Sequence, residues 1–554
     1  MAEQSPTASV RFQPWHDLRW ITGCVVAIGL GWLAWNLFGP EPPIRVSRET
    51  TFITEPLAAD GLPDYLAAVL AVIGPAPPAE ENAAAGLLQT LWPLGIAGGD
   101  QPAVCKALGI PNEPPAQPLR EPTRDAAAGI TDDVYAASYA GPWTAEDFPA
   151  LDSWMQAHAT AIDRLVAAAD RPRYWLPSPT LLKTGPQMLV GMLLPDIQEV
   201  RVASRLLVSR AMWHLGGNRP AEAWRDIRAA YRLSRLLAAP ESGPTWLVTQ
   251  LVAIATGAMA DAAALQLLAL PVLPADLLAE IRRDLDALAA LPAPAAGAAF
   301  ERLMGVDAIV WMARRQPGGR SARANALTMY GSGPGVSPLA GLALTSLDWN
   351  VMLERMNTAY DDLDAACGLP THAARRTALE RQRQQVIDRA AAPWRSWWTA
   401  AGNMLLLASN RGQRSAAVGD LFQAMLLPAL SSWSDAVARG PAQFDLTRTA
   451  AALAAWRADR EAGSPEYPER LHDLVPRYLA AVPIDPFSEK PFLYERRSDG
   501  YLMYSVGSNG IDDGGDHFSG EIINGEWQEA RQEIDPRNSD IVVRMPIPRR
   551  PVKP

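Results

Sequence analysis

The sequence predicts a mainly α-helical protein with a membrane anchor near its N-terminus and a small α+β module at its C-terminal end. Three observations predict this fold class: an uncharged apolar run, a long region with apolar residues at helical spacing, and alternating strand patterns near the C-terminus. At 554 residues the chain is longer than one compact domain usually is, so we expect several parts. These are a short tail (1–19), a transmembrane helix (20–38), an α-helical domain (50–440) and a C-terminal module (447–554).

The composition is that of a folded protein rather than a disordered one. Hydrophobic residues make up 48% of the chain and charged residues 20%. The net charge is −10, and Lys and Arg do not cluster in runs. Because nucleic-acid binders present concentrated positive charge, we expect no nucleic-acid partner.

The apolar run is the expected membrane anchor. Residues 20–38 (WITGCVVAIGLGWLAWNLF) carry no formal charge, and a helix needs about 20 apolar residues to cross a bilayer. Trp20, Trp32 and Trp35 bracket the run, as is typical of aromatic rings at the lipid headgroup level. A buried helix and a cleaved signal peptide are the alternatives. The run ends in Asn-Leu-Phe-Gly-Pro rather than a small-residue cleavage site, which favours an uncleaved anchor.

The charges beside the anchor do not decide its orientation. Arg11 and Arg19 precede it, whereas Arg45 and Arg48 follow it closely, so the positive-inside count is tied. The short N-terminal tail favours an N-terminus inside the cytoplasm, with the bulk of the chain outside.

Three cysteines are too few for a disulfide framework. Cys24 lies in the expected span, and Cys105 and Cys367 lie outside it. The last two can pair or remain two separate buried thiols, and we favour separate thiols.

Apolar residues at helical spacing predict a series of helices between residues 60 and 440. Dense prolines between Pro111 and Pro122 predict a surface loop among them. An alanine-rich helix is expected from Thr447. The other expected helices cover residues 60–70, 81–91, 145–169, 245–270, 275–290, 347–367, 382–392 and 421–437.

A helical hairpin is expected between Pro195 and Ala239. Gly216-Gly217 is predicted to end its first helix in the left-handed conformation, and Asn218 to cap the second. The pattern Leu-Leu-Ala, Leu-Gly-Gly, Ala-Trp and Ala-Ala-Tyr resembles one tetratricopeptide-like repeat, which occurs once at this quality. The side chains expected to meet in the hairpin core are Leu206, Trp213, Trp224 and Ile227.

The segment from Tyr467 to Gly515 has the most specific pattern in the chain. A Leu-x-x-Leu-Val-Pro sequence predicts a short helix, and Asp485-Pro486 predicts a turn in which the carboxylate accepts local hydrogen bonds. Two alternating apolar stretches then flank Asp499-Gly500, which is the usual sign of a β-hairpin.

An acidic, glycine-rich loop follows the hairpin. Asn509, Asp512, Asp513 and Asp516 lie within eight residues, between glycines that let backbone carbonyls turn inward. Ca²⁺ takes 6–8 oxygen ligands of these kinds, so the loop is a candidate calcium site. It is not an EF-hand: if Asn509 is the first residue of the twelve-residue loop, the last position, which requires a bidentate Glu, is Gly520. A solvated turn that binds no metal is the alternative.

In the order of its motifs, the segment from Tyr467 to Gly515 resembles the C-terminal part of the major pseudopilin of type II secretion systems. The resemblance implies a calcium-stabilised loop in which Asn509 stands at the position of an aspartate and Asp540-Ile541 aligns with a second element. The intervening residues 517–539 are more numerous than in that family.

The chain departs from the pseudopilin pattern elsewhere. The expected span lies more than 400 residues upstream of the tail, and no prepilin-peptidase site precedes Trp20. The chain therefore looks like uncharacterised bacterial proteins that are membrane-anchored and share this tail. That resemblance implies an inner-membrane protein with most of its residues outside the cytoplasm.

No residue pattern predicts catalysis. The six histidines are scattered, so neither a zinc site nor a catalytic or cofactor-binding residue is nominated. Glu222 and Asp226 lie one turn apart between Arg219 and Arg225, which predicts a solvated, ion-paired helix face.

The interpretation is a non-enzymatic envelope protein that binds protein partners, with Ca²⁺ as its candidate ligand. The alternatives are an accessory component of a secretion or pilus-like apparatus and an envelope enzyme with an unrecognised site.

Overall fold

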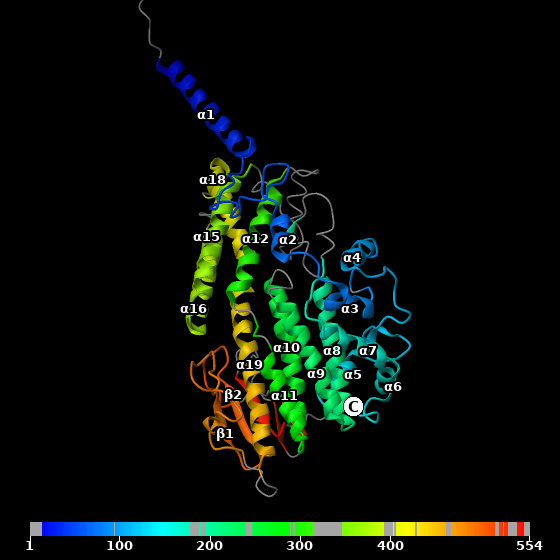
Figure 1. Cartoon of the computed structure of the whole chain (residues 1–554). Helices are drawn as coiled ribbons and strands as arrows, with labels where there is room; N and C mark the ends of the chain where they lie inside the picture. Colours follow the sequence, from blue (N-terminus) through cyan, green and yellow to red (C-terminus); the bar gives the residue numbers. More distant parts are fainter. Residues whose placement is uncertain are drawn as a thin grey trace, which may run out of the picture. The chain divides into compact units, whose positions relative to one another are not determined.

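A computed structural model shows a mainly helical chain with a small three-stranded antiparallel sheet, which confirms the predicted fold class at this level (Figure 1). The chain divides into two compact units. Unit 1 comprises Met1–Thr54, Ile309–Ala359 and Arg383–Leu427, and unit 2 comprises Glu55–Ala308, Tyr360–Gln382 and Pro428–Pro554. The structure describes residues 14–93, 95–177, 188–189, 195–239, 246–288, 290–291, 294–314, 346–392, 403, 406–426, 429–460, 467–515, 520–523, 526–529 and 540–547.

Unit 1 is built around the first helix and the segment that leaves it. Its helical elements are α1 (Pro14–Phe38), the first part of α15 (Trp349–Cys367), the last part of α16 (His372–Ala391) and α18 (Arg411–Leu426). Asn350 of α15 accepts from the backbone N–H of Arg45 (2.8 Å) and donates to the carbonyl of Pro43 (3.0 Å). Asn357, two turns later, donates to the carbonyls of Glu49 (3.0 Å) and Thr50 (2.6 Å). The proline-rich segment after α1 is therefore fixed along α15.

Unit 2 contains most of the helices and the C-terminal strands. The sequence patterns predict many of its helices, but three lie where none was expected, at Gln101–Leu108, Asp132–Ser138 and Pro294–Ala313, and α16 begins ten residues before the expected start of its helix. Unit 2 includes most of α12 (Pro294–Ala313) and parts of α15 and α16. Its other helices are α2 (Tyr65–Ile73), α3 (Ala83–Thr90), α4 (Gln101–Leu108), α5 (Asp132–Ser138), α6 (Pro149–Ala157), α7 (Ala159–Ala169), α8 (Pro195–Gly216), α9 (Pro220–Ala238), α10 (Leu247–Leu268), α11 (Ala275–Ala287) and α19 (Ala429–Ala458). Short 3-10 turns lie at Ala79–Glu81 (η1), Pro122–Arg124 (η2) and Leu471–Leu474 (η7).

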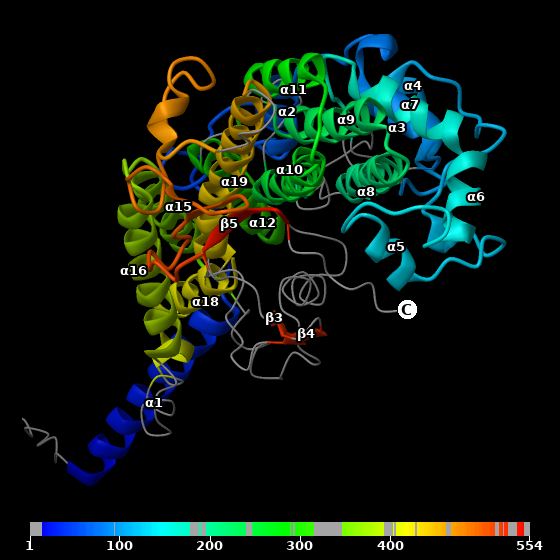
Figure 2. The ribbon, with the colours of Figure 1, turned by 90° about the horizontal axis from the view of Figure 1, so that it is seen from below.

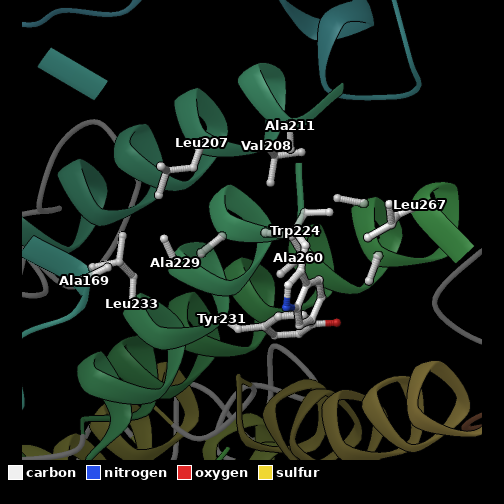
Figure 3. Close-up of a cluster of buried hydrophobic side chains, with 14 of the residues drawn as sticks. Ala169, Leu207, Val208, Ala211, Trp224, Ala229, Tyr231, Leu233, Ala260 and Leu267 are labelled. Carbon is white, nitrogen blue, oxygen red and sulfur yellow. The ribbon is translucent and has the colours of Figure 1, made fainter. Parts of the chain in front are cut away.

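The core of unit 2 lies where α10 packs against α8, α9 and α19. Figure 3 shows Trp224 and Tyr231 of α9 beside Ala260 and Leu267 of α10, and all four side chains are buried. The predicted hairpin of helices is thus confirmed. Three of its expected core residues are buried: Leu206, Trp224 and Ile227. The fourth, Trp213, is half-buried, because its indole turns to donate to Asp152 Oδ1 of α6 (2.8 Å).

The turn between α8 and α9 differs from the prediction. Asn218, not a glycine, adopts the left-handed conformation (φ 54°), and it does not cap α9, whose N-cap is Arg219. Gly216 is required for a different reason: a Cβ there would lie 1.9 Å from the carbonyl oxygen of Trp143. Close backbone approach, which no local pattern reveals, therefore selects this glycine.

Two helix boundaries also differ from the sequence interpretation. The helix expected over residues 145–169 is two helices, α6 and α7, separated at His158. The segment 421–437 belongs to two helices, α18 and α19, and α19 runs without a break through residue 447, where the C-terminal module was expected to begin. Pro441 lies within α19.

The C-terminal strands form a sheet in the order β1-β2-β5. Strands β1 (Leu493–Arg496) and β2 (Tyr501–Ser505) form the predicted antiparallel hairpin, and β5 (Ile541–Met545) pairs antiparallel with β2. Strands β3 (Gly520–Ile523) and β4 (Glu526–Glu529) form a separate pair. Figure 2 shows β5 beside α19, and both β2 and β5 contact that helix.

Side chains fasten this sheet region to α19. Arg457 Nη1 donates to the hydroxyl of Tyr467 (2.9 Å), and the hydroxyl of Tyr478 donates to Asp459 Oδ2 (2.8 Å). The ring of Tyr467 lies edge-on to that of Tyr501, which is buried in the sheet. The module therefore shares one apolar core with the helices of unit 2.

The two cysteines outside α1 are separate thiols, as favoured from the sequence. Cys105 and Cys367 are both buried and free. Burial raises the pKa of each thiol, that of Cys367 to about 11, so neither is a reactive thiolate at neutral pH.

Candidate functional site

The acidic loop begins at a turn that is clamped to the end of β2. Asp485 is buried, and its Oδ1 accepts from the backbone N–H of Phe487 (3.1 Å) and the hydroxyl of Ser505 (2.7 Å). Its Oδ2 accepts from the backbone N–H of Val506 (3.2 Å). The predicted local turn is confirmed, and the same carboxylate also fixes where the loop leaves the sheet.

Glycines give the loop its path. Gly507, Gly510, Gly514 and Gly515 all have positive φ, between 63° and 75°, a region that residues with a Cβ rarely adopt. At Gly515 a Cβ would also lie 2.9 Å from a methyl carbon of Leu502. Substitution there is consequently excluded both by backbone conformation and by packing.

Three of the predicted ligands hydrogen-bond within the loop. Asn509 Oδ1 accepts from the backbone N–H of Ile511 (3.0 Å), and its Nδ2 donates to Asp513 Oδ2 (3.0 Å). Asp512 Oδ1 accepts from the hydroxyl of Tyr504 (2.9 Å) and from the backbone N–H of Gly514 (2.9 Å). These bonds hold the carboxylates on the loop, and each still has an oxygen with further lone pairs.

Asp540 reaches the same loop from the start of β5. Its Oδ2 accepts from the backbone N–H groups of Asp513 (3.2 Å) and Gly515 (2.8 Å). The strand register places it there, because Ile541 pairs with Ser505, the last residue of β2. Asp540 therefore lies next to the acidic loop, although it is distant from it in the sequence.

The other carboxylate oxygen of Asp540, Oδ1, is a candidate metal ligand. The side chain is buried, and Oδ1 has no hydrogen-bond partner among the residues that the structure describes. Burial raises the pKa of Asp540 to about 6; the carboxylates of Asp513 and Asp512 add to the rise, and the two backbone N–H groups oppose it. A buried carboxylate oxygen without a partner is costly, and a bound cation or proton would satisfy it.

The donor set fits a calcium ion in chemistry but does not form a closed cage. Among the described residues, no three carboxylate, histidine or cysteine side chains converge closely enough to hold a metal. Asp513 and Asp540 would supply carboxylate oxygens, and Asp512 and Asn509 lie beside them. Asp516, the remaining predicted ligand, lies outside the described residues.

Helix α1 is a second candidate binding feature because it exposes apolar surface. Its apolar side chains are exposed, with exposed fractions of 71% for Ile28, 62% for Leu30 and 61% for Phe38. In the described part of the chain, one helix is long and apolar enough to cross a membrane by length and composition: α10, a core helix with more than half of its apolar stretch buried. The apolar part of α1, Thr22–Phe38, is shorter than that length.

Buried charged groups elsewhere in unit 2 connect helices. Asp226, expected on a solvated face, is buried and receives two bonds from Arg210 of α8, 2.8 Å from Nε and 2.6 Å from Nη2. Tyr231 of α9 donates to Asp261 Oδ1 of α10 at 2.5 Å, and burial raises the pKa of Asp261 to about 7. The sequence interpretation missed both pairs, because the partner arginine and tyrosine lie on other turns or helices.

No protein-family model, curated protein or solved structure matches this chain.

Proposed function

We propose that this chain is a single-pass membrane protein of the cell envelope that recruits protein partners through the body outside the cytoplasm. The exposed apolar surface of α1 carries the proposal. Transfer of apolar surface out of water is favourable by about 25 cal/mol per Å², so a helix with this surface needs an apolar environment. The uncharged run 20–38 is 19 residues long, about 28 Å of helix, which is close to the roughly 30 Å of a hydrocarbon core.

The contrast with α10 supports this assignment. Both helices are apolar, but α8, α9 and α19 cover α10, whereas most of the described side chains of α1 between Trp20 and Phe38 are exposed, with Asn36 and Leu37 as the buried exceptions. The bilayer is the partner we assign to α1, with the inner membrane and an N-terminus inside the cytoplasm as the proposed topology.

The helical part of unit 2 is the proposed recruiting region. The antiparallel pair α8 and α9, joined by a short turn, supports the tetratricopeptide-like interpretation, since such pairs present grooves to partner segments. The buried ion pair of Arg210 and Asp226 and the Tyr231–Asp261 bond serve this framework by fixing neighbouring helices.

A second candidate function is an accessory component of a secretion or pilus-like apparatus. The observation that favours it is the order of elements in the tail: η7, the β1–β2 hairpin, the acidic glycine loop, and then β5, which brings Asp540 back to the loop. That order is the one the pseudopilin resemblance implies.

We propose that Ca²⁺ is the ligand of the acidic loop. The unpartnered, buried Oδ1 of Asp540 supports this, together with the carboxylates of Asp512 and Asp513 nearby. The ion would stiffen the tail by joining β5 to the loop that follows β2. A site with few carboxylates binds weakly, in the range of about 10⁻⁴–10⁻³ M known for extracellular modules.

Alkaline carbonate extraction of membranes tests the anchor. The full chain should stay with the membrane, and the double change Ile28→Glu with Leu30→Glu should release it. The matched control is Val72→Glu with Val272→Glu, which charges two other exposed apolar positions (65% and 82% exposed) and should leave the protein in the membrane. Release of the unchanged chain would contradict the proposal.

Purification after cross-linking in intact envelopes separates the two functions. One stable partner that is lost when the α8–α9 surface is changed supports recruitment by unit 2. Recovery of secretion-apparatus subunits that is lost when the tail is changed supports the second candidate.

A further inference from the structure

The end of α1 is held by two arginines of α18, which lies beside it in unit 1 (Figure 1). The last carbonyls of any helix lack partners within the helix. Here Arg411 donates to the carbonyls of Trp35 (2.9 Å) and Pro40 (2.8 Å), and Arg414 donates to that of Asn36 (2.5 Å). Arg414 is itself buried, so its bond to Asn36 is shielded from water, whereas the two bonds of Arg411 are exposed.

The backbones at this joint also meet closely. The N–H of Arg411 donates to Asn36 Oδ1 (3.1 Å), and the hydroxyl of Ser346 donates to the carbonyl of Gly39 (2.7 Å). A Cβ at Gly39 would lie 2.3 Å from the carbonyl oxygen of Trp35 and 2.9 Å from Arg411 Nη2. The last turns of α1 are consequently fixed to α18 and cannot swing independently of it.

A further hydrogen bond joins α1 to the residues before α18, nearer the N-terminus of α1. The indole N–H of Trp32 donates to the carbonyl of Ser409 (3.0 Å), although 61% of the Trp32 side chain is exposed. Residues 406–409 are helical, and Asn410 connects them to α18. Trp32 precedes Phe38 by six residues, so this bond lies about 9 Å back along α1 from its C-terminal end.

The direction of this second segment follows from its contacts. Ser409 touches α1 at Trp32, and Arg411 touches it further on, at Trp35 and Pro40. The two segments therefore run in the same direction, and Leu406 lies further from the end of α1 than Ser409 does. The Leu406 side chain is 47% exposed at this position.

We propose that residues 406–409 form a second membrane contact, in which Leu406 enters the lipid beside α1, nearly one helical turn deeper than Ser409 and Trp32. This inference rests on the proposed function, because it takes α1 as the anchor. Trp32 lies six residues before the end of the proposed span, where an indole N–H finds little water and needs a protein partner. The Ser409 carbonyl is that partner, so its helical turn lies at the depth of Trp32.

Lipid is the occupant we assign because this surface continues that of the anchor. Trp35 and Phe38, 58% and 61% exposed, lie on the same stretch of α1. The sequence that leads to residue 403 contains Trp394, Trp397 and Trp398; these lie outside the described residues, and Trp is the residue type enriched at membrane interfaces.

Depth-dependent fluorescence quenching tests the inference. The full chain carrying Cys24→Ser receives one environment-sensitive dye at Leu406→Cys, Leu421→Cys or Ile28→Cys; Cys105 and Cys367 are buried. Each protein is placed in nanodiscs of phosphatidylethanolamine and phosphatidylglycerol, with or without nitroxide attached near the top of the acyl chain. Leu421 is the matched control, because it is 55% exposed in α18 and lies about 22 Å further along the helical path than Leu406.

We expect a blue-shifted emission and a loss of fluorescence with nitroxide at positions 28 and 406, and neither at position 421. Quenching at 28 without quenching at 406 would overturn the second contact and leave the anchor standing. Equal quenching at 406 and 421 would also overturn it, because the contact would not be confined to the Trp32 layer. Absence of quenching at 28 would overturn the anchor itself, and with it this inference.

Discussion

At the scale of single residues, Asp540 determines what the acidic loop can do. It lies 25 residues after Gly515 in the sequence and 2.8 Å from that residue's backbone nitrogen in the structure. Its carboxyl has a raised pKa, about 6 instead of 3.8, because it is buried near other carboxylates. Ionised Asp540 therefore destabilises the folded protein unless a cation accompanies it.

The first prediction concerns the pH dependence of calcium stabilisation. The pKa of Asp540 is higher in the folded state than in the unfolded state. The metal-free protein should therefore lose stability as the pH rises from about 4 to about 6. Calcium favours the ionised carboxylate, so the calcium-dependent rise in Tm should be larger at pH 7.5 than at pH 5. At a hundredfold excess over Kd, binding to the folded state alone stabilises it by about 2.7 kcal/mol. Calorimetry of the full chain in detergent, with calcium or chelator, measures this difference.

Asp540→Asn is the sharpest variant for that measurement. The amide oxygen can still accept from Asp513 and Gly515, but the formal charge is lost. The variant should show no calcium-dependent shift, and in chelator at pH 7.5 it should melt at or above the unchanged chain. Asp485→Asn changes the turn clamp instead, so it should lower the Tm with and without calcium. A calcium shift that persists in Asp540→Asn would show that this residue is not a ligand.

The sequence predicts the role of single residues correctly where their contacts lie within a few positions along the chain. The density of Asn509, Asp512 and Asp513 between glycines indicates the loop correctly, because those side chains bond within a few positions. The clamp between Asp485 and Ser505 and the approach of Trp143 to Gly216 join distant positions. No spacing in one sequence reveals such contacts.

At the scale of elements, the α8–α9 hairpin is the framework of unit 2. Trp224 is 1% exposed, contacts the α10 side of the core (Figure 3), and its indole donates to Asp284 of α11 (2.9 Å). One side chain therefore connects α9 to two other helices.

The second prediction is that Trp224→Ala destabilises unit 2 by about 3–5 kcal/mol, the usual cost of removing a buried aromatic side chain. Trp224→Phe should cost less, because it keeps the ring and loses the bond to Asp284. Trp20→Ala is the matched control: Trp20 is 74% exposed, so its removal should leave the denaturant midpoint unchanged. An unchanged midpoint for Trp224→Ala would contradict the packing of the hairpin.

The segment after α1 provides a third prediction. Asn350 fixes Pro43 and the backbone of Arg45, and Asn357 fixes Glu49 and Thr50. The double change Asn350→Ala with Asn357→Ala should therefore expose Arg45 and Arg48 to trypsin and increase the initial cleavage rate there. Thr358→Ala, an exposed change on the same helix, should leave the rate unchanged; equal rates in all three proteins would show that the segment is not held by α15.

Helix existence was easier to predict than helix ends. The apolar periodicity of residues 145–169 continues through His158, so it indicates one helix where the backbone makes two. In the same way, the alanine-rich pattern after Thr447 identifies only the second half of α19, because its first half is less regular and contains Pro441.

At the scale of the whole molecule, the sequence indicates the main parts but not their connections. The tail appeared to be a separate module after residue 447, yet its Tyr467 and Tyr501 belong to the core built with α19. Likewise, unit 1 is assembled from three separate stretches of the chain, which no local pattern could predict. Apolar side chains from distant segments bury one another in a shared core, and long-range hydrogen bonds such as Trp32 to Ser409 add to these contacts.

The central claim is that α1 crosses the membrane and leaves the rest of the chain outside the cytoplasm. The most direct test fuses two reporters to Pro554 in separate strains: an enzyme that is active only outside the cytoplasm, and one that is active only within it. The first reporter alone should be active, and deletion of residues 14–38 should abolish that activity. Activity of the cytoplasmic reporter alone on the full chain would show that α1 does not place the C-terminus outside the cytoplasm.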